Sequence, residues 1–383
     1  MDLRNSQAMK LKVRTMNNKS INLRVDLLKL LIIIAISFAL VSIIVFAVSE
    51  EPLVAIHAFF IGPFATFRRI GNLIETMTPL IFAALAVTVI FRSGLFSLIA
   101  EGAFYMGTVG AMIIALTMNM SAIVHPIVII LFGGMLGLIA ASIPALLKLF
   151  WNVNELVTSI MLNYICLFVG IYLLNFHFRD TATTAFHSYT FPETASLPVI
   201  IYGTRVHIGT IIALILCVLV WLFLYRSKLG FRLRVTGDNQ RFAKYVGIST
   251  ATVMFLSQLI AGAIAGAGGA VEVIGMHTRF RFDSLPGFGW TGIVVFLLAR
   301  SHPLFIPIAA LFMAYLDVGA HIMARSSDVS ADMVFIIRAV MMLLIAAEAL
   351  LGRLRQRMIV KASDEEERLS RAAEQAGGGA SNG

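Results

Sequence analysis

The residues with the clearest capacity for chemistry are charged side chains inside long apolar runs: Glu101, Glu272, Asp317, Arg338 and Glu348. An ionisable group in a membrane span costs about 2.5–3.5 kcal/mol on insertion scales, so each one needs a partner or a role. Asp317 and Arg338 could pair or could face a wet pathway. Glu101 could favour the N-terminus of a helix through the helix dipole. A proton relay would need several aligned carboxylates, and the sequence does not clearly show them.

The sequence lacks motifs that mark soluble enzymes and metalloproteins. No G-x-x-x-x-G-K-[ST] phosphate loop occurs, so we do not expect this chain to bind ATP itself. The eight histidines are dispersed, and Cys166 and Cys217 each lie inside an apolar run. A disulfide framework or a thiolate metal site is therefore not expected. We predict no catalytic residue, no metal and no cofactor in this chain.

Membrane spans must hold these charges in place. Hydrophobic residues make up 59% and charged residues 13% of the 383 residues, which leaves too little polar surface for a soluble chain. The net charge of +9 sits in a few loops, without the basic, aromatic-interleaved stripe of a nucleic-acid partner. The apolar run 27–48 is longer than the ~7–15 residues of a signal-peptide core. We expect it to be a retained first span.

A spanning helix needs about 20 mostly apolar residues. Runs of roughly that length occupy residues 27–48, 70–91, 98–118, 123–147, 156–176, 206–225, 251–275, 303–320 and 333–351. A shorter apolar piece, 287–299, is too short at 1.5 Å per residue to cross a hydrocarbon core of about 30 Å alone. We expect it to pack inside the bundle or to be partly re-entrant. The sequence thus predicts an all-α, polytopic integral membrane protein with about ten transmembrane helices.

The distribution of basic residues predicts an orientation. Lysine and arginine concentrate in the arm 1–26, in the loop 226–250 and just after the last predicted span. The loops on the other side hold only scattered arginines, and this positive-inside bias places both termini in the cytoplasm. We therefore divide the chain into the basic arm 1–26, a transmembrane domain 27–352 and a partly disordered cytoplasmic tail 353–383. Residues 177–205 form the long outer loop.

The inner loop 226–250 contains a predicted short amphipathic helix. Asp238 or Asn239 can cap its start and Gly247 can end it, which leaves about two turns. One face is apolar, with charged residues on the others, and the apolar residues are Phe242, Tyr245 and Val246. Such a helix could sit in a groove of another protein or lie on anionic lipid, and the residues alone leave both open.

Two features of the spans concern helix contacts. The run 261–270 is made almost wholly of alanine and glycine, and Gly262 and Gly266 lie four residues apart. This spacing favours close helix packing, with glycine flexibility for gating as a secondary reading. Asn154 can cap a helix that begins at Glu155, and Asn163 lies about two turns deeper. A buried amide there could join helices or line a pathway.

Four stretches, taken together and in order, resemble a known family. They are Arg92–Phe96 continuing to Glu101–Gly102, Asn154–Tyr164, Gly237–Ile248, and Gly289–Ile293 continuing to Arg300–Pro303. The chain resembles the bacterial ABC-transporter permeases for simple sugars and nucleosides, of the branched-chain amino acid-like type, and more closely the nucleoside branch. It departs from the family at Ala103, where glutamine is frequent, and at Ala299, where glycine is common. These departures leave the architecture intact and bear on the substrate.

The resemblance implies a permease in the bacterial inner membrane that imports a nucleoside or simple sugar-like solute by alternating access. It implies as partners a second permease subunit, the same or a sister chain, two cytoplasmic ATPase subunits that carry ATP and Mg, and an extracytoplasmic substrate-binding protein. It also makes the short inner helix the coupling helix for the ATPase, with residues Asp238, Asn239, Arg241, Phe242, Ala243, Tyr245, Val246 and Gly247. Candidate pathway or structural residues are Glu101, Asn163, Asp317 and Arg338. The alternative is an ion-coupled secondary transporter that uses the intramembrane carboxylates.

Overall fold

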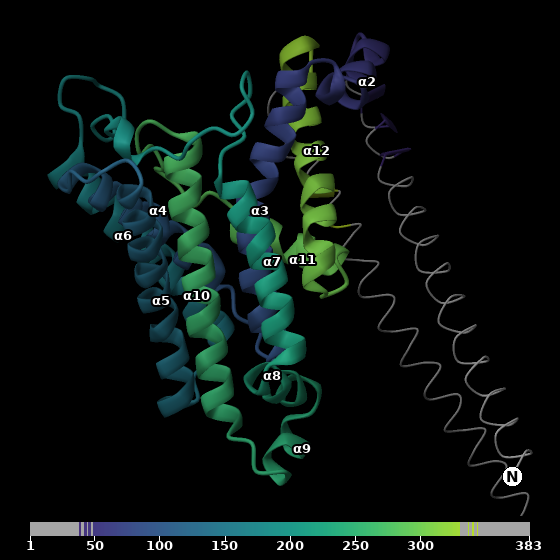
Figure 1. Cartoon of the computed structure of the whole chain (residues 1–383). Coiled ribbons are helices and arrows are strands. Elements are labelled where there is room, and N and C mark those ends of the chain that lie inside the picture. Colours follow the sequence, from purple (N-terminus) through teal and green to yellow (C-terminus); the bar gives the residue numbers. More distant parts are fainter. Residues whose placement is uncertain are drawn as a thin grey trace, which may run out of the picture. The chain divides into compact units, whose positions relative to one another are not determined.

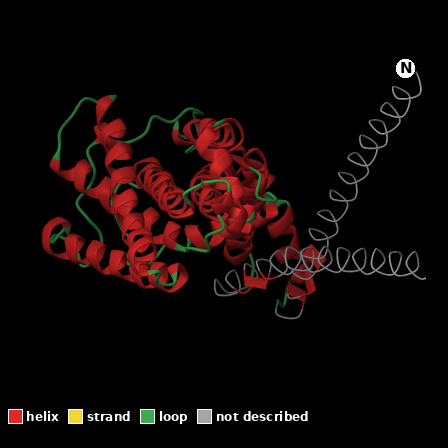
Figure 2. Cartoon of the chain, turned by 90° about the horizontal axis from the view of Figure 1, so that it is seen from below, coloured by secondary structure: helices red, strands yellow, loops and turns green. Residues whose placement is uncertain are grey.

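The computed structural model describes residues 49–329 without a break, together with a few residues at 38–46 and 336–343. The chain divides into two units, and the larger one, Leu53–Val334, holds the elements discussed below. The described part is almost wholly helical (Figure 2), with two isolated β-bridges and no strand. The predicted first and last spans lie largely outside the described residues. The all-α prediction is confirmed.

Seven helical segments in the described part are long and apolar enough to cross a membrane. They are α3 (Phe67–Arg92), α4 (Ile99–Thr117), α5 (Val124–Trp151), α6 (Glu155–Leu173) with a π-helical turn (Leu174–Phe178), α7 (Gly209–Arg226), α10 (Thr250–Met276), and α12 (Ile306–Ser326) with its 3₁₀ entry (Pro303–Phe305). Each coincides with a predicted apolar run. The count of ten and the location of the termini remain predictions.

The described part also contains four shorter α-helices, besides 3₁₀ turns at Gly62–Phe64 and Glu193–Ala195. The four α-helices are α2 (Pro52–Phe60), α8 (Lys228–Asp238), α9 (Gln240–Tyr245) and α11 (Phe288–Leu298). Helix α11 confirms the short apolar element predicted at 287–299. The inner loop holds α8 as well as the expected short helix. Ser227 caps α8, since its hydroxyl accepts a hydrogen bond from the Gly230 amide at 2.9 Å.

Helix α10 lies at the centre of this bundle and packs against α5, α4 and α3 (Figure 1). Small residues make this possible, because a Cβ atom added to Gly107 would stand 2.0 Å from the carbonyl oxygen of Gly266. A Cβ atom added to Gly262 would stand 2.5 Å from the carbonyl oxygen of Gly137. The backbones of α4, α5 and α10 therefore meet directly, as the close-packing reading of Gly262 and Gly266 predicts.

The helices differ in how much of their surface other helices cover. Most residues of α3 and α4 are buried, whereas α5, α6 and α7 leave one apolar side uncovered. Leu131 on α5 and Phe168 on α6 are examples, with exposed fractions of 69% and 66%. An apolar side of this kind suits a helix that contacts lipid along its length.

The two ends of the bundle are built differently. One end, called here the α9 end, holds α8, α9 and the connections after α3 and α11. The opposite end holds the long connection 179–208, whose residues Asp180 and Ser188 bond to Arg279 and to the Phe280 amide. The tertiary bonds at the opposite end fix an otherwise irregular loop onto the exit from α10.

Candidate functional site

The first site is the break between α3 and α4, where residues 93–98 are not helical. Gly94 has φ +80°, a left-handed conformation that favours glycine, and a Cβ atom there would meet the Cα atom of Gly237 at 3.0 Å. Leu95, Ser97 and Leu98 are buried. Irregular backbone buried in a membrane protein has to find hydrogen-bond partners from neighbouring elements.

Helix α6 supplies partners for this break through Ser159 and Asn163, which are four residues apart. The Leu98 amide donates to Oγ of Ser159 at 3.0 Å, and Nδ2 of Asn163 donates to the Leu98 carbonyl at 3.1 Å. The Gly102 amide donates to Oδ1 of Asn163 at 2.9 Å. Of the two readings left open by the sequence, these bonds support the one in which Asn163 joins helices. Both the oxygen and the nitrogen of its side-chain amide are engaged.

Glu101 connects the start of α4 with the start of α11. Its carboxylate accepts hydrogen bonds from the Gly287 amide at 2.6 Å and from the Gly289 amide, and the residue is 1% exposed. Gly287, the N-cap residue of α11, also has φ +80°, like Gly94 in the turn after α3. The carboxylate lies in the first turn of α4 and at the N-terminus of α11, and both positions favour a negative charge. Glu101, Ser159, Asn163, Gly287 and Gly289 are called the junction below.

Two other predicted polar residues are not part of the junction. Asp317 lies on α12, where Nε2 of His321 is 3.9 Å from its Oδ1 atom. Arg338 lies outside the described residues, as does Glu348, so the pairing of Asp317 with Arg338 stays a prediction. In the described part no group of three or more histidine, cysteine or acidic side chains could hold a metal ion.

The second site is helix α9. The sequence named Asp238 or Asn239 as its cap, and the structure has Asn239 in that place. Its Oδ1 accepts from the amides of Arg241 and Phe242, each at 3.0 Å, whereas Asp238 ends α8. Gly247 ends the turn with φ +80°. The helix and both of its signals are therefore where the sequence predicts them.

The faces of α9 are unequal in their packing. Ala243 is fully buried against the bundle, while three large apolar side chains point away from it. Their exposed fractions are 55% for Phe242, 91% for Tyr245 and 54% for Val246. An exposed apolar face on a basic loop is typical of a surface that another molecule covers.

A set of contacts that sequence reasoning missed ties α8 to the membrane helices. Arg92, at the end of α3, donates to the Ser301 carbonyl at 2.8 Å and to the Tyr225 hydroxyl at 3.2 Å. The guanidinium of Arg234 on α8 lies 4.7 Å from the centre of the Tyr225 ring. A movement of α8 would thus displace the ends of α3 and α7. The only sign of these contacts in the sequence was a basic residue, Arg92, at the end of an apolar run. Hydropathy alone assigns such a residue to the membrane interface.

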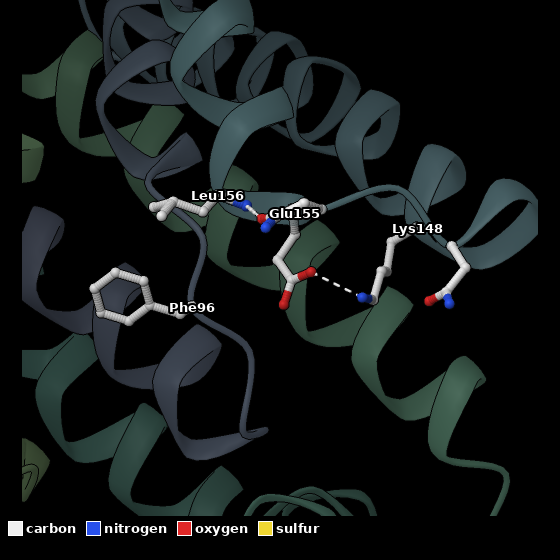
Figure 3. A pocket seen from close by; sticks show the side chains of 6 residues that line it. Phe96, Lys148, Glu155 and Leu156 are labelled. Carbon is white, nitrogen blue, oxygen red and sulfur yellow. Dashed lines mark hydrogen bonds and ion pairs between the residues drawn. The ribbon is translucent and has the colours of Figure 1, made fainter.

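An open hollow of about 530 Å³ lies beside the ends of α5 and α6 (Figure 3). It is lined by Phe96, Lys148, Asn152, Asn154, Glu155 and Leu156. Nζ of Lys148 lies 3.0 Å from Oε2 of Glu155, and Asn154 caps α6 as the sequence predicts, since its Oδ1 accepts from the Leu156 amide at 2.9 Å. The ion pair and the cap use these polar groups to fix the turn between two spans.

Comparison with known proteins assigns the fold and both sites to a family. The family described as the branched-chain amino acid transport system permease component matches residues 69–346, and this chain belongs to it. Membership makes the chain a non-enzymatic permease subunit of an ABC transport system, and it implies ATPase and substrate-binding partners. With its apolar helices, the chain is a multi-pass protein of the bacterial inner membrane.

Several relatives are similar over most of their length. A guanosine ABC transporter permease of Bacillus subtilis is 31% identical, over 75% of this chain and 83% of its own. A glucose ABC transporter permease of Haloferax volcanii is 30% identical, over 81% of this chain and 84% of its own. A nucleoside ABC transporter permease of Lactococcus lactis is 29% identical, over 87% and 93%. The search of solved structures found no match.

Proposed function

We propose that this chain moves a nucleoside or simple sugar-like solute into the cytoplasm by alternating access, driven by ATP hydrolysed on two separate ATPase subunits. A second permease subunit, the same or a sister chain, completes the pathway, and an extracytoplasmic binding protein delivers the solute. The relatives named for guanosine, nucleosides and glucose support this class of solute.

The observation that carries the proposal is the exposed face of α9. Phe242, Tyr245 and Val246 present apolar surface beyond the α9 end of the bundle, next to the charges of Arg241 and Lys244. A groove on a cytoplasmic ATPase would bury this face. Movement of the ATPase would then move α9 and, with it, α8. The Arg92, Tyr225 and Arg234 contacts then pass that movement to α3 and α7.

The ion-coupled alternative has less support from the geometry. Both carboxylate oxygens of Glu101 are held by backbone amides at the start of α11, so this group is engaged in positioning a helix. A proton carrier has to change its protonation state and its partners during each cycle. Protonation of Glu101 would weaken its bond to at least one of the two buried amides, so the geometry favours a structural role for this group.

The direct test is uptake by the complete transporter. The chain is purified with the ATPase and binding-protein products of its neighbouring genes and reconstituted in vesicles that enclose ATP. Labelled uridine, guanosine and glucose are offered outside together with the binding protein. We expect uptake of at least one solute with enclosed ATP and none with a non-hydrolysable analogue. Uptake that follows an imposed proton gradient and ignores ATP would overturn the proposal.

A further inference from the structure

Two buried glutamates at the end of the bundle away from α9 each keep a free oxygen. Glu75 on α3 is 3% exposed and Glu272 on α10 is 4% exposed. In the described part of the chain, Oε1 of Glu75 and Oε2 of Glu272 have no hydrogen-bond partner. The two carboxylates lie close enough for each charge to act on the other, with Arg205 also in range of Glu75.

The neighbourhood of these carboxylates is polar although it is buried. One turn from Glu75, Oγ1 of Thr78 lies 2.8 Å from Oγ1 of Thr210, which joins α3 to the start of α7. Beside Glu272, Nε2 of His277 is 3.7 Å from Oε1. The site therefore gathers carboxylate and hydroxyl groups from three helices that pack on one another.

Folding alone does not account for this arrangement. A buried carboxylate oxygen without a donor is costly, and the junction shows how the same fold satisfies a carboxylate when its role is structural. Glu101 receives two backbone amides, whereas Glu75 and Glu272 each keep an acceptor open. An unsatisfied buried group that persists in a fold needs an explanation, and a ligand that completes the bonding provides one.

We propose that Glu75 and Glu272 form a solute-contact site for a neutral molecule with neighbouring hydroxyl groups. This inference rests on the proposed function and narrows it. Hydroxyl groups of a ribose or hexose ring would donate to the free oxygens, as acidic side chains accept from ribose hydroxyls in nucleotide sites. The Thr78 and Thr210 hydroxyls can exchange their mutual bond for bonds to the solute. The location on α3, α7 and α10 puts the site where a solute would enter from the binding-protein side.

The test compares Glu75→Gln and Glu272→Gln with Glu51→Gln, the same change at an exposed glutamate. Uptake by the reconstituted transporter is measured with whichever of uridine, guanosine or glucose the unchanged protein carries, and with its deoxy analogue lacking the neighbouring hydroxyls. We expect each buried substitution to raise KM for the hydroxylated solute about ten- to hundredfold, since an oxygen that accepts from the solute is replaced by an amide nitrogen that cannot accept. Discrimination against the deoxy analogue should fall by a similar factor, while Glu51→Gln changes neither.

Stability separates a solute-contact role from a structural one. Replacing a buried glutamate that has an unpartnered oxygen should leave the melting temperature of the permease unchanged or raise it, because function and stability conflict at such a site. A variant that folds with unchanged KM and discrimination overturns the inference, and so does one whose melting temperature falls with no change in discrimination. If a Gln variant does not assemble, the Glu→Asp change at the same position is used instead, because it keeps the carboxylate and shifts its oxygens. Unchanged discrimination against the deoxy analogue in that variant would also overturn the inference. Absence of ATP-dependent uptake by the unchanged protein would instead refute the proposed function.

Discussion

The junction and helix α9 both contain residues singled out by the sequence, but their surroundings are opposite. At the junction, Glu101 and Asn163 are almost fully buried, and their side-chain groups bond to backbone from other parts of the chain. On α9, the side-chain hydrogen bonds of Asn239 are local ones with the Arg241 and Phe242 amides, and the large side chains are exposed. One region completes its bonds within the fold, and the other leaves apolar surface uncovered.

This difference separates structural roles from roles that need a partner. A substitution at the junction should act on the stability of the chain, because it leaves buried amides or carbonyls without partners. A substitution on the exposed face of α9 should leave stability almost unchanged and act on assembly, because those side chains touch little else.

The largest loss of stability is expected for Glu101→Leu. The change removes the acceptors of the Gly287 and Gly289 amides, and each unsatisfied buried amide costs about 1–3 kcal/mol. Thermal unfolding of the purified chain in detergent measures the effect. Glu101→Gln retains one oxygen acceptor, so its melting temperature should lie between those of Glu101→Leu and the unchanged protein. Glu51→Leu, at an exposed position, should have the melting temperature of the unchanged protein. Equal melting temperatures for Glu101→Leu and the unchanged protein would contradict a stabilising role for the junction.

A smaller loss is expected for Gly137→Ala in the seam between α5 and α10. The added methyl group would stand 2.3 Å from the Gly262 carbonyl oxygen, and overpacking of this kind costs about 1–3 kcal/mol. Gly134→Ala is the matched control on the same helix. Its nearest contact would be 3.2 Å, and the better helix propensity of alanine, about 0.5–1 kcal/mol, offsets the crowding. Similar melting temperatures for the two variants would contradict direct backbone contact in the seam.

The smallest structural effect is expected for Asp180→Asn in the loop at the opposite end. The pKa of Asp180 is lowered by the Ala182 amide and by the hydrogen bond from Arg279, 2.8 Å away. A lowered pKa stabilises the folded loop above the ordinary aspartate value of about 3.9, and this contribution is lost as the pH falls through the folded-state pKa. Hydrogen exchange in this loop should therefore be faster in Asp180→Asn at pH 7, and the difference between the two proteins should shrink as the pH falls through the folded-state pKa of Asp180. Asp283→Asn, at an exposed aspartate, is the control and should show no difference.

The sequence predicted the elements whose causes are local. Hydropathy located the seven described spans and α11, and cap residues located α9 between Asn239 and Gly247. Helix α8 was not predicted, because its arginines and Gly230 interrupt the helical spacing of apolar residues. Ser227 was nevertheless recognisable in the sequence as a possible N-cap residue. The partners of Glu101 lie 186 and 188 positions away, so no local pattern could reveal them. The free oxygens of Glu75 and Glu272 likewise depend on how three helices pack.

The most direct test of the account is the double substitution Phe242→Asp and Tyr245→Asp in the complete transporter. The measurement is solute-stimulated ATPase activity, together with recovery of the ATPase with the permease during purification. We predict an unchanged melting temperature of the permease chain and loss of both ATPase recovery and solute stimulation, because charge replaces the apolar face that a partner would bury. Arg241→Gln on another face of α9 should retain most of both. Full ATPase recovery and stimulation in the doubly substituted protein would contradict the assignment of α9 as the coupling element.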